Sequence, residues 1–267
     1  MNKIILGLIS LTVLSCGSTP EVRQVDAAAA ANASKGYVVS NEPAESITTS
    51  AAPNPNAVTF KKNVSASAIK KHIEFLASDA LAGRKTGTEG IDEAANYIIK
   101  EFQQAGVKPY FTSYRDKFDA KGLDGYNVVG MLEGTDAELK NEFIVIGAHY
   151  DHIGTADTVG ADTIANGAND NASGTSAVIE LAKYFAQSKT NKRSIIFALF
   201  SAEEMGLLGS AHLAERLKKT NINPYVMFNI EMIGVPMTDK EYSLCLTGYE
   251  QGNRAQKCNA YAGAKVM

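Results

Sequence analysis

The chain has 267 residues, of which 45% are hydrophobic and 21% charged, so it can form one large domain or two small ones around a sizeable core. Its formal net charge of −3 leaves no strongly basic surface, which argues against nucleic acid as a partner.

The N-terminus has the pattern of an export signal at residues 1–16. Lys3 precedes an apolar stretch from Ile4 to Leu14, which is too short to span a bilayer comfortably but has the length of a signal-peptide core. The ending VLSC resembles the lipobox of bacterial lipoproteins, in which the cysteine becomes the lipidated first residue. This resemblance implies an exported protein that Cys16 anchors at the outer membrane, in the periplasm or at the cell surface. A buried segment with an incidental cysteine is the alternative.

Residues 17–60 predict a disordered tether that leads to a folded domain at residues 61–267. They are rich in Ala, Ser, Thr, Asn and Pro and show no sustained apolar period. The domain opens with two predicted helices, the second of which ends at Gly106. The expected buried faces consist of Ile69, Ile73, Leu76 and Ala77 in the first helix and of Ala94, Ile98 and Phe102 in the second.

Apolar strands then alternate with helices. Strands are predicted at 126–132, 142–148, 194–200 and 225–230, with a weaker pattern at 242–247. Helices are predicted at 172–187 and 206–218, and the first has an apolar stripe of Val178, Leu181, Ala182 and Phe185. Near-continuous apolar strands between amphipathic helices favour a sheet that is covered on both faces. The predicted fold is a three-layer α/β/α sandwich with a mostly parallel, mixed sheet.

Histidines and carboxylates follow the predicted strands. They are His149, Asp151 and His152 after the second strand, Asp170 in the next connection, Glu203 and Glu204 after the third strand, and Glu231 after the fourth. In open α/β sheets the carboxyl ends of the strands meet at one crevice, where these carboxylates would repel one another. A bound cation relieves that repulsion, and a mixed histidine and carboxylate set suits zinc. Scattered polar residues at strand ends are the alternative. From the residues alone, His149, Asp151 and His152 are all candidate ligands.

Four motifs in order carry a resemblance to a known family. HYDHIG, GANDNASGT, SAEEMGLLGS and NIEMIG resemble the motifs of the di-zinc aminopeptidases of metallopeptidase family twenty-eight, which includes bacterial leucyl aminopeptidases and relatives of glutamate carboxypeptidase. The upstream segment LASDALAGRKTGTEG is also similar to one that precedes the catalytic domain in many members. The resemblance covers about residues 70 to 262. It implies the fold of a zinc exopeptidase.

The resemblance also implies metal ligands. His149 would bind the first zinc, with Asp151 orienting its imidazole. Asp170 would bridge two zinc ions, and a cis peptide bond would follow it. Glu231 would complete the first site, where many family members have Asp. Glu204 would bind the second zinc.

Glu203 is the general base that the resemblance implies. It would take a proton from a water activated by zinc and return the proton to the leaving amine. The implied substrate is a peptide with a free N-terminus, and the implied activity is that of a zinc-dependent aminopeptidase. His152 would be a neighbour of the site and not a ligand. His72 and His212 have structural or surface roles, and Asp157 and Asp162 lie in a polar loop that could hold at most a weak accessory cation.

The C-terminal part departs from the family pattern. The second zinc of the family takes a further histidine far downstream, whereas none of the four histidines here follows His212. We therefore expect a chain truncated at its C-terminus, without the final strand or strands of the sheet. A natural one-metal form is the alternative. Cys245 and Cys258 could form a disulfide, or Cys245 could pack in the core.

Two other functions stay open. One is a non-catalytic binding module on the same fold, which the absent histidine favours and the intact Glu203, His149 and Asp170 oppose. The other is a transferase that resembles the glutaminyl cyclases, which share the scaffold and typically work with one zinc.

Overall fold

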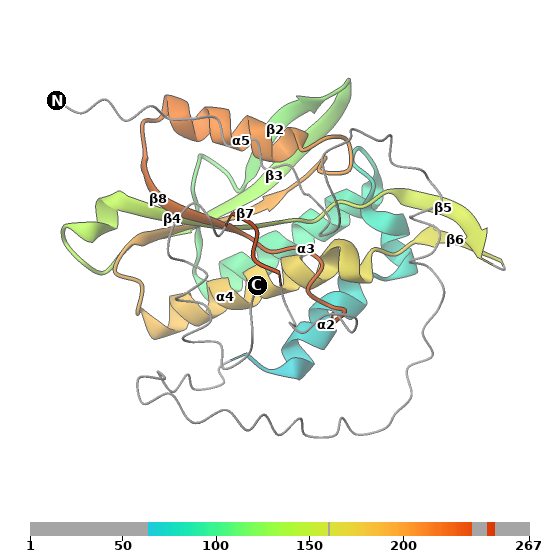
Figure 1. Cartoon of the computed structure of the whole chain (residues 1–267), viewed down its shortest axis with the longest axis horizontal. Helices are drawn as coiled ribbons and strands as arrows, with labels where there is room; N and C mark the ends of the chain where they lie inside the picture. Colours follow the sequence, from blue (N-terminus) through green and yellow to red (C-terminus); the bar gives the residue numbers. More distant parts are fainter. Residues whose placement is uncertain (1–63, 160, 237–244, 249–267) are drawn as a thin grey trace. The chain divides into compact units, whose positions relative to one another are not determined.

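A computed structural model of the chain describes residues 64–159, 161–236 and 245–248 (Figure 1). The predicted signal, Cys16 with its predicted lipidation and the whole of the predicted tether lie outside these residues, as does Cys258, so the predictions about them stay predictions. In the described part of the chain, no helix combines the length and the apolar character needed to cross a membrane.

One mixed sheet forms the centre of the fold, in the order β1-β3-β7-β4-β8 with β2 paired to β3. Its strands are β1 (Lys108–Pro109), β2 (Arg115–Ala120), β3 (Leu123–Leu132), β4 (Glu142–His149), β7 (Ser194–Phe200) and β8 (Asn223–Asn229). Strand β4 runs parallel to both β7 and β8, whereas β3 is antiparallel to β7. The mixed sheet is confirmed, and it is partly parallel: β7, β4 and β8 are parallel, whereas β1, β2 and β3 join the sheet through antiparallel pairing.

Strands β1 and β2 are absent from the sequence-based expectations. Strand β2 reads RDKFDA, whose charges hide the strand pattern, and only two of its residues are buried. Two residues with positive φ, Lys121 at 56° and Gly122 at 87°, join β2 to β3. Such a pair makes the tight turn that suits the twist of a hairpin. Because of this hairpin, β3 begins at Leu123, three residues before the predicted strand.

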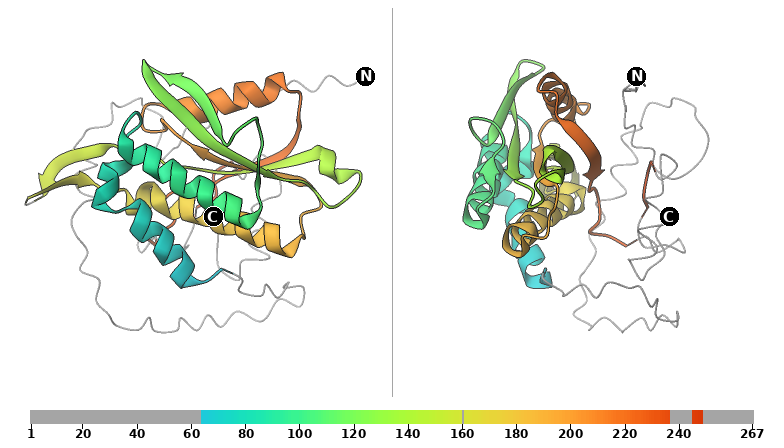
Figure 2. Two further views of the ribbon diagram at one scale, coloured as in Figure 1. Left: turned by 180° about the vertical axis from the view of Figure 1, so that it is seen from behind. Right: turned by 90° about the vertical axis from the view of Figure 1, so that its left-hand side faces the viewer.

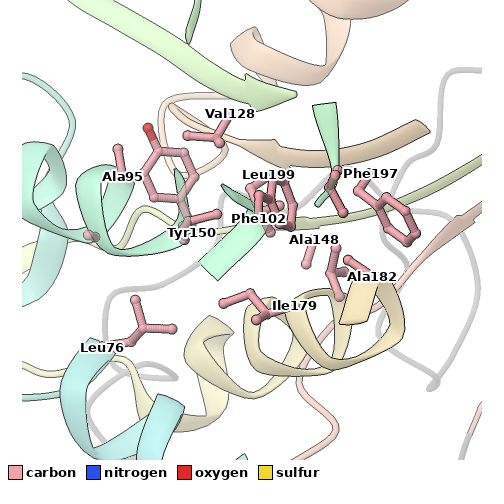
Figure 3. Packing of buried hydrophobic residues seen from close by; sticks show 14 of the residues in the cluster. Leu76, Ala95, Phe102, Val128, Ala148, Tyr150, Ile179, Ala182, Phe197 and Leu199 are labelled. Carbon is pink, nitrogen blue, oxygen red and sulfur yellow. The ribbon is translucent and has the colours of Figure 1, made fainter. Parts of the chain in front are cut away.

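Helices cover both faces of the sheet, as predicted (Figure 2). They are α2 (Ala66–Leu76), α3 (Glu89–Ala105), α4 (Gly174–Ser188) and α5 (Leu208–Lys219). The first three pack around the larger apolar cluster, which Figure 3 shows between Phe102, Ile179 and Leu199. Helix α5 contributes Leu213 and Leu217 to a second cluster on the other face. The three-layer sandwich is therefore confirmed.

Two buried helix faces differ from the prediction. Helix α2 buries His72 beside Leu76, because the His72 ring is within hydrogen-bonding distance of Glu180 at 2.9 Å and of the Tyr97 hydroxyl at 2.6 Å. Ile69 and Ile73 are only half-buried. Helix α4 buries Val178 and Ala182 as expected, but also Ile179 and Ala186, while Leu181 and Phe185 are half-buried. His72 therefore has the structural role that was expected.

Three further segments correct the prediction. The polar loop at 155–166 is a hairpin of β5 (Gly154–Val159) and β6 (Asp162–Ala165), in which Asp157 and Asp162 are exposed. Strand β8 is the edge of the described sheet, and its Tyr225 and Met227 are 56% and 49% exposed. This strand is therefore not covered on both faces, in contrast to the prediction. Residues 245–247, the described part of the weak strand pattern at 242–247, form no strand.

Candidate metal centre

The carboxyl ends of β7, β4 and β8 bring the predicted site residues together (Figure 1). His149 is the last residue of β4 and pairs with Phe200, the last residue of β7. Strand β8 ends opposite Gly147, and the Ile230 amide donates to the Gly147 carbonyl at 2.8 Å, so Glu231 follows directly at the same edge. The parallel register therefore explains why residues far apart in sequence meet here.

The imidazole of His149 is fixed on one side and faces the site on the other. Its Nδ1 lies 3.2 Å from the Asp151 carbonyl oxygen and 3.6 Å from the Asp151 carboxylate. Its Nε2 is 3.0 Å from Oδ1 of Asp170 but makes no hydrogen bond, and it is the only fully buried side-chain N or O atom without one among the described residues. A buried nitrogen without a hydrogen bond is costly unless another ligand satisfies it. A metal ion would do so.

Asp170 lies at a break in a π-helical turn, η3 (Ala168–Ser173), and the peptide bond that follows it is cis, as expected. The next residue, Asn171, joins this turn to the end of β8. Its Nδ2 donates to the Ile230 carbonyl at 3.0 Å, and its Oδ1 accepts from the Met232 amide at 3.2 Å. These two bonds hold Glu231 beside Asp170.

The potential ligand atoms fall into two groups that share Asp170. The first comprises His149, Asp170 and Glu231, and the second comprises His152, Asp170 and Glu204. Within each group the ligand atoms lie within 4.8 Å of one another. A mixed set of imidazole and carboxylate ligands is typical of zinc, and the buried Nε2 of His149, which makes no hydrogen bond, supports a cation in the first group. The residues therefore fit the metal that the sequence predicts.

The segment after β7 positions Glu203 and Glu204. Ala202 has a φ of +53°, which ends the extended strand and turns the chain. The two oxygens of the buried Asp151 accept from the backbone amides of Glu203 and Glu204 at 3.2 and 3.3 Å. Asp151 therefore contacts both the His149 ring and the turn that carries the two glutamates.

Burial and crowding of charge change the protonation of the site. Burial, together with the nearby Glu204 and Glu231, raises the pKa of Glu203 to about 7, although the nearby His149 opposes this shift. Burial also raises the pKa of Glu231. For His149, burial acts to lower the pKa, but Asp151 and Asp170 outweigh it and raise that pKa to about 10. Without a cation, this raised pKa favours the protonated form of His149, whose charge adds to that of the nearby Arg84 in balancing the carboxylates.

A buried arginine, which the sequence did not predict, connects the segments of this site. Arg84 is 1% exposed and follows helix α2 in the segment η1 (Asp79–Arg84). Its guanidinium donates to four backbone carbonyls, those of Tyr150 at 2.9 Å, Asn166 at 2.7 Å, Gly167 at 2.9 Å and Leu76. Tyr150 is next to His149, and Gly167 precedes the turn of Asp170. The arginine fork therefore links the two segments that carry these ligands.

The remaining histidines lie outside the centre or beside it. His212 lies 3.2 Å from Asp116 and stacks on Phe118, which agrees with the expected packing role. His152 lies beside the centre, where it was expected, and its Nδ1 is 2.7 Å from Oε1 of Glu204. The sequence already indicated this position, because His152 follows His149 by three residues in the motif HYDHIG.

Comparison with known proteins gives the same family as the motifs. The sequence profile of peptidase family M28 matches residues 127–265. A probable zinc metalloprotease of Pyrenophora teres f. teres is 31% identical over 179 residues, which cover 64% of this chain and 37% of that protein. Leupeptin-inactivating enzyme 1 of Streptomyces exfoliatus is 30% identical over 193 residues, which cover 70% of this chain and 39% of that enzyme. This chain therefore spans well under half the length of these curated relatives.

Solved structures show the same fold. The LapA aminopeptidase of Legionella pneumophila superposes with a TM-score of 0.60 at 24% sequence identity, covering 77% of this chain and 54% of LapA. At this identity the likeness supports the fold alone, which is an α/β fold with a mixed sheet whose structural neighbours include zinc exopeptidases.

Proposed function

Because this chain belongs to peptidase family M28, we propose that it hydrolyses the N-terminal peptide bond of peptides with the help of bound zinc. The observation that carries the proposal is the pair of ligand groups that share Asp170, one of which contains the buried Nε2 of His149, an atom without a hydrogen bond. The aminopeptidase activity of the LapA relative supports the choice of exopeptidase.

The proposed first metal position is held by His149, Asp170 and Glu231, and the second by Asp170 and Glu204. When bound there, zinc supplies Lewis-acid chemistry, which polarises a carbonyl oxygen and lowers the pKa of a water. Asp151 fixes the His149 ring through contacts at Nδ1, so that Nε2 stays available as a ligand atom.

Glu203 is the proposed general base. Burial raises its pKa to about 7. A carboxylate with a pKa near neutral pH can both accept and release a proton under those conditions. The backbone amide of Glu203 donates to Asp151, which keeps Glu203 at the centre. This hydrogen bond does not involve the Glu203 carboxylate. Its carboxylate would accept the proton of the attacking water and then donate it to the leaving amine, which leaves as a neutral group.

The carboxylates of the site also favour a substrate with a free N-terminus. An ammonium group at the end of a peptide would be attracted to any carboxylate of the centre whose charge a bound cation does not offset, whereas an acetylated N-terminus would carry no charge for it to recognise. This difference separates an aminopeptidase from an endopeptidase on the same fold.

The test measures zinc content and hydrolysis of aminoacyl-nitroanilides by the purified chain. We expect hydrolysis that a chelator abolishes and zinc restores, with at least about 100-fold less turnover when the substrate is N-acetylated. Metal-free and inactive protein would contradict the proposal and favour a binding module. Release of pyroglutamate from a peptide with an N-terminal glutamine would favour the cyclase.

We also propose that the protein is exported and anchored through a lipid on Cys16, on the basis of the lipobox-like ending VLSC. Bacteria that express the chain with labelled palmitate should incorporate label into it, and the chain should sediment with membranes. Replacement of Cys16 by serine should abolish both. An unlabelled wild-type chain in the soluble fraction would contradict lipid anchoring.

A further inference from the structure

His152 completes the second ligand group. Its Nδ1 is 2.7 Å from Oε1 of Glu204 and 4.0 Å from Oδ2 of Asp170. For a tetrahedral ion with ligand bonds of 2.0–2.2 Å, two ligand atoms lie roughly 3.3 Å apart. The two distances from Nδ1 fall on either side of this separation. An ion between the three side chains would therefore require only small side-chain movements.

The two oxygens of Asp170 are divided between the two histidines. Oδ1 is 3.0 Å from Nε2 of His149, whereas the contact of Asp170 with His152 is through Oδ2. This division is the arrangement that a carboxylate needs to bridge two ions, with one oxygen on each. His149 and His152 thus each contact a different oxygen of Asp170.

The position of His152 is fixed by the backbone around it. Its amide donates to the Arg84 carbonyl at 3.2 Å. Gly167, with a φ of +61°, lies against the ring, since a Cβ at this position would be 2.7 Å from Cδ2 of His152. The Gly167 carbonyl accepts from the Arg84 guanidinium at 2.9 Å. The ring is therefore held at the centre before any ion binds, and its side chain is only 13% exposed.

We propose that His152, through Nδ1, is a ligand of the second metal ion together with Asp170 and Glu204, an inference that rests on the proposed function of the centre. The competing explanation is that His152 only forms a hydrogen bond that orients Glu204. The two explanations differ in what a glutamine at this position would do, because its amide can donate to Glu204 but is a poor replacement for imidazole as a zinc ligand.

The test titrates the metal-free full chain with Co²⁺, following the visible absorption of the ion and the metal content after dialysis. The wild-type chain should bind two ions. His152→Ala and His152→Gln should each bind one ion at wild-type affinity, with the affinity for the second lowered by more than about 100-fold, beyond the effect of an outer-shell change. His149→Ala should keep the ion that His152→Ala loses. His212→Ala, which removes a histidine remote from the centre, should bind two.

Folding of every variant is checked by circular dichroism and thermal unfolding. Two ions bound by His152→Gln at wild-type affinity would overturn the ligand role in favour of the hydrogen bond. One ion bound equally by the wild type and His152→Ala would overturn it as well, while leaving a metal-dependent function intact. A wild-type chain that binds no ion would overturn both the inference and the proposed function.

Discussion

Replacement of Glu203 by glutamine should lower kcat/KM for aminoacyl-nitroanilides by about 10²–10⁴-fold, the range for loss of a general acid–base group. Glutamine has nearly the same shape but cannot accept the proton from water. Because Glu203 belongs to neither ligand group, the metal content should stay at the wild-type value. The measurement is steady-state kinetics beside metal analysis on the same preparation.

Glu215→Gln provides the matched control. Glu215 is an exposed residue of α5 whose ion pair with Lys219 spans 2.8 Å at the surface, so its loss should change neither activity nor metal content measurably. A Glu203→Gln enzyme with more than a tenth of the wild-type kcat/KM would rule out the base role. A loss of activity together with metal would instead make Glu203 a ligand.

The pH profile gives a second readout of the same prediction. A base must be deprotonated, so activity should fall as pH decreases through the pKa of Glu203, which burial raises to about 7 in the metal-free chain. Bound cations favour the carboxylate and lower this pKa, so the acidic limb of kcat/KM should have a midpoint at or below about 7. This limb should be absent from the residual activity of Glu203→Gln.

The positions of the site residues could be predicted because the parallel strands have long apolar patterns. Strand β4 reads EFIVIGAH and β7 reads SIIFALF, so their carboxyl ends were visible in the sequence. The rule that ligands bind at such ends then brought His149, Glu203 and Glu231 to one crevice. Their roles as ligands or base remain predictions.

The parts that escaped prediction depend on tertiary contacts. Strand β2 and the hairpin of β5 and β6 have polar sequences whose strand pairing comes from turn geometry and neighbouring strands. His72 interrupts an apolar face, and its burial is explained by its contacts with Glu180 and the Tyr97 hydroxyl. Arg84 has no local signal for burial, because the carbonyls that it binds come from segments up to 83 residues away. The closeness of His152 to Glu204 likewise joins residues 52 apart.

The second large effect that we expect is a loss of stability on replacement of Arg84. Replacement by methionine should lower the free energy of unfolding of the metal-free chain by at least about 3 kcal/mol, since each buried carbonyl left without a donor costs roughly 1–3 kcal/mol. Four carbonyls lose their donor, and water can compensate only some of them. For a domain of this size, a loss of 3 kcal/mol corresponds to a decrease in Tm of about 6–12 °C. Urea unfolding in the presence of a chelator measures it.

Two variants separate the hydrogen bonds of Arg84 from its charge. Arg84→Lys keeps the positive charge near Asp170 but lacks the planar fork, so we expect it to retain most of the destabilisation. Lys85→Met removes a cation from the adjacent exposed position and should change stability by less than about 0.5 kcal/mol. Because Arg84 holds the Tyr150 and Gly167 carbonyls beside the ligand segments, Arg84→Met should also bind metal more weakly. Full stability in Arg84→Lys would show that charge, and not the fork, is what the fold requires at this position.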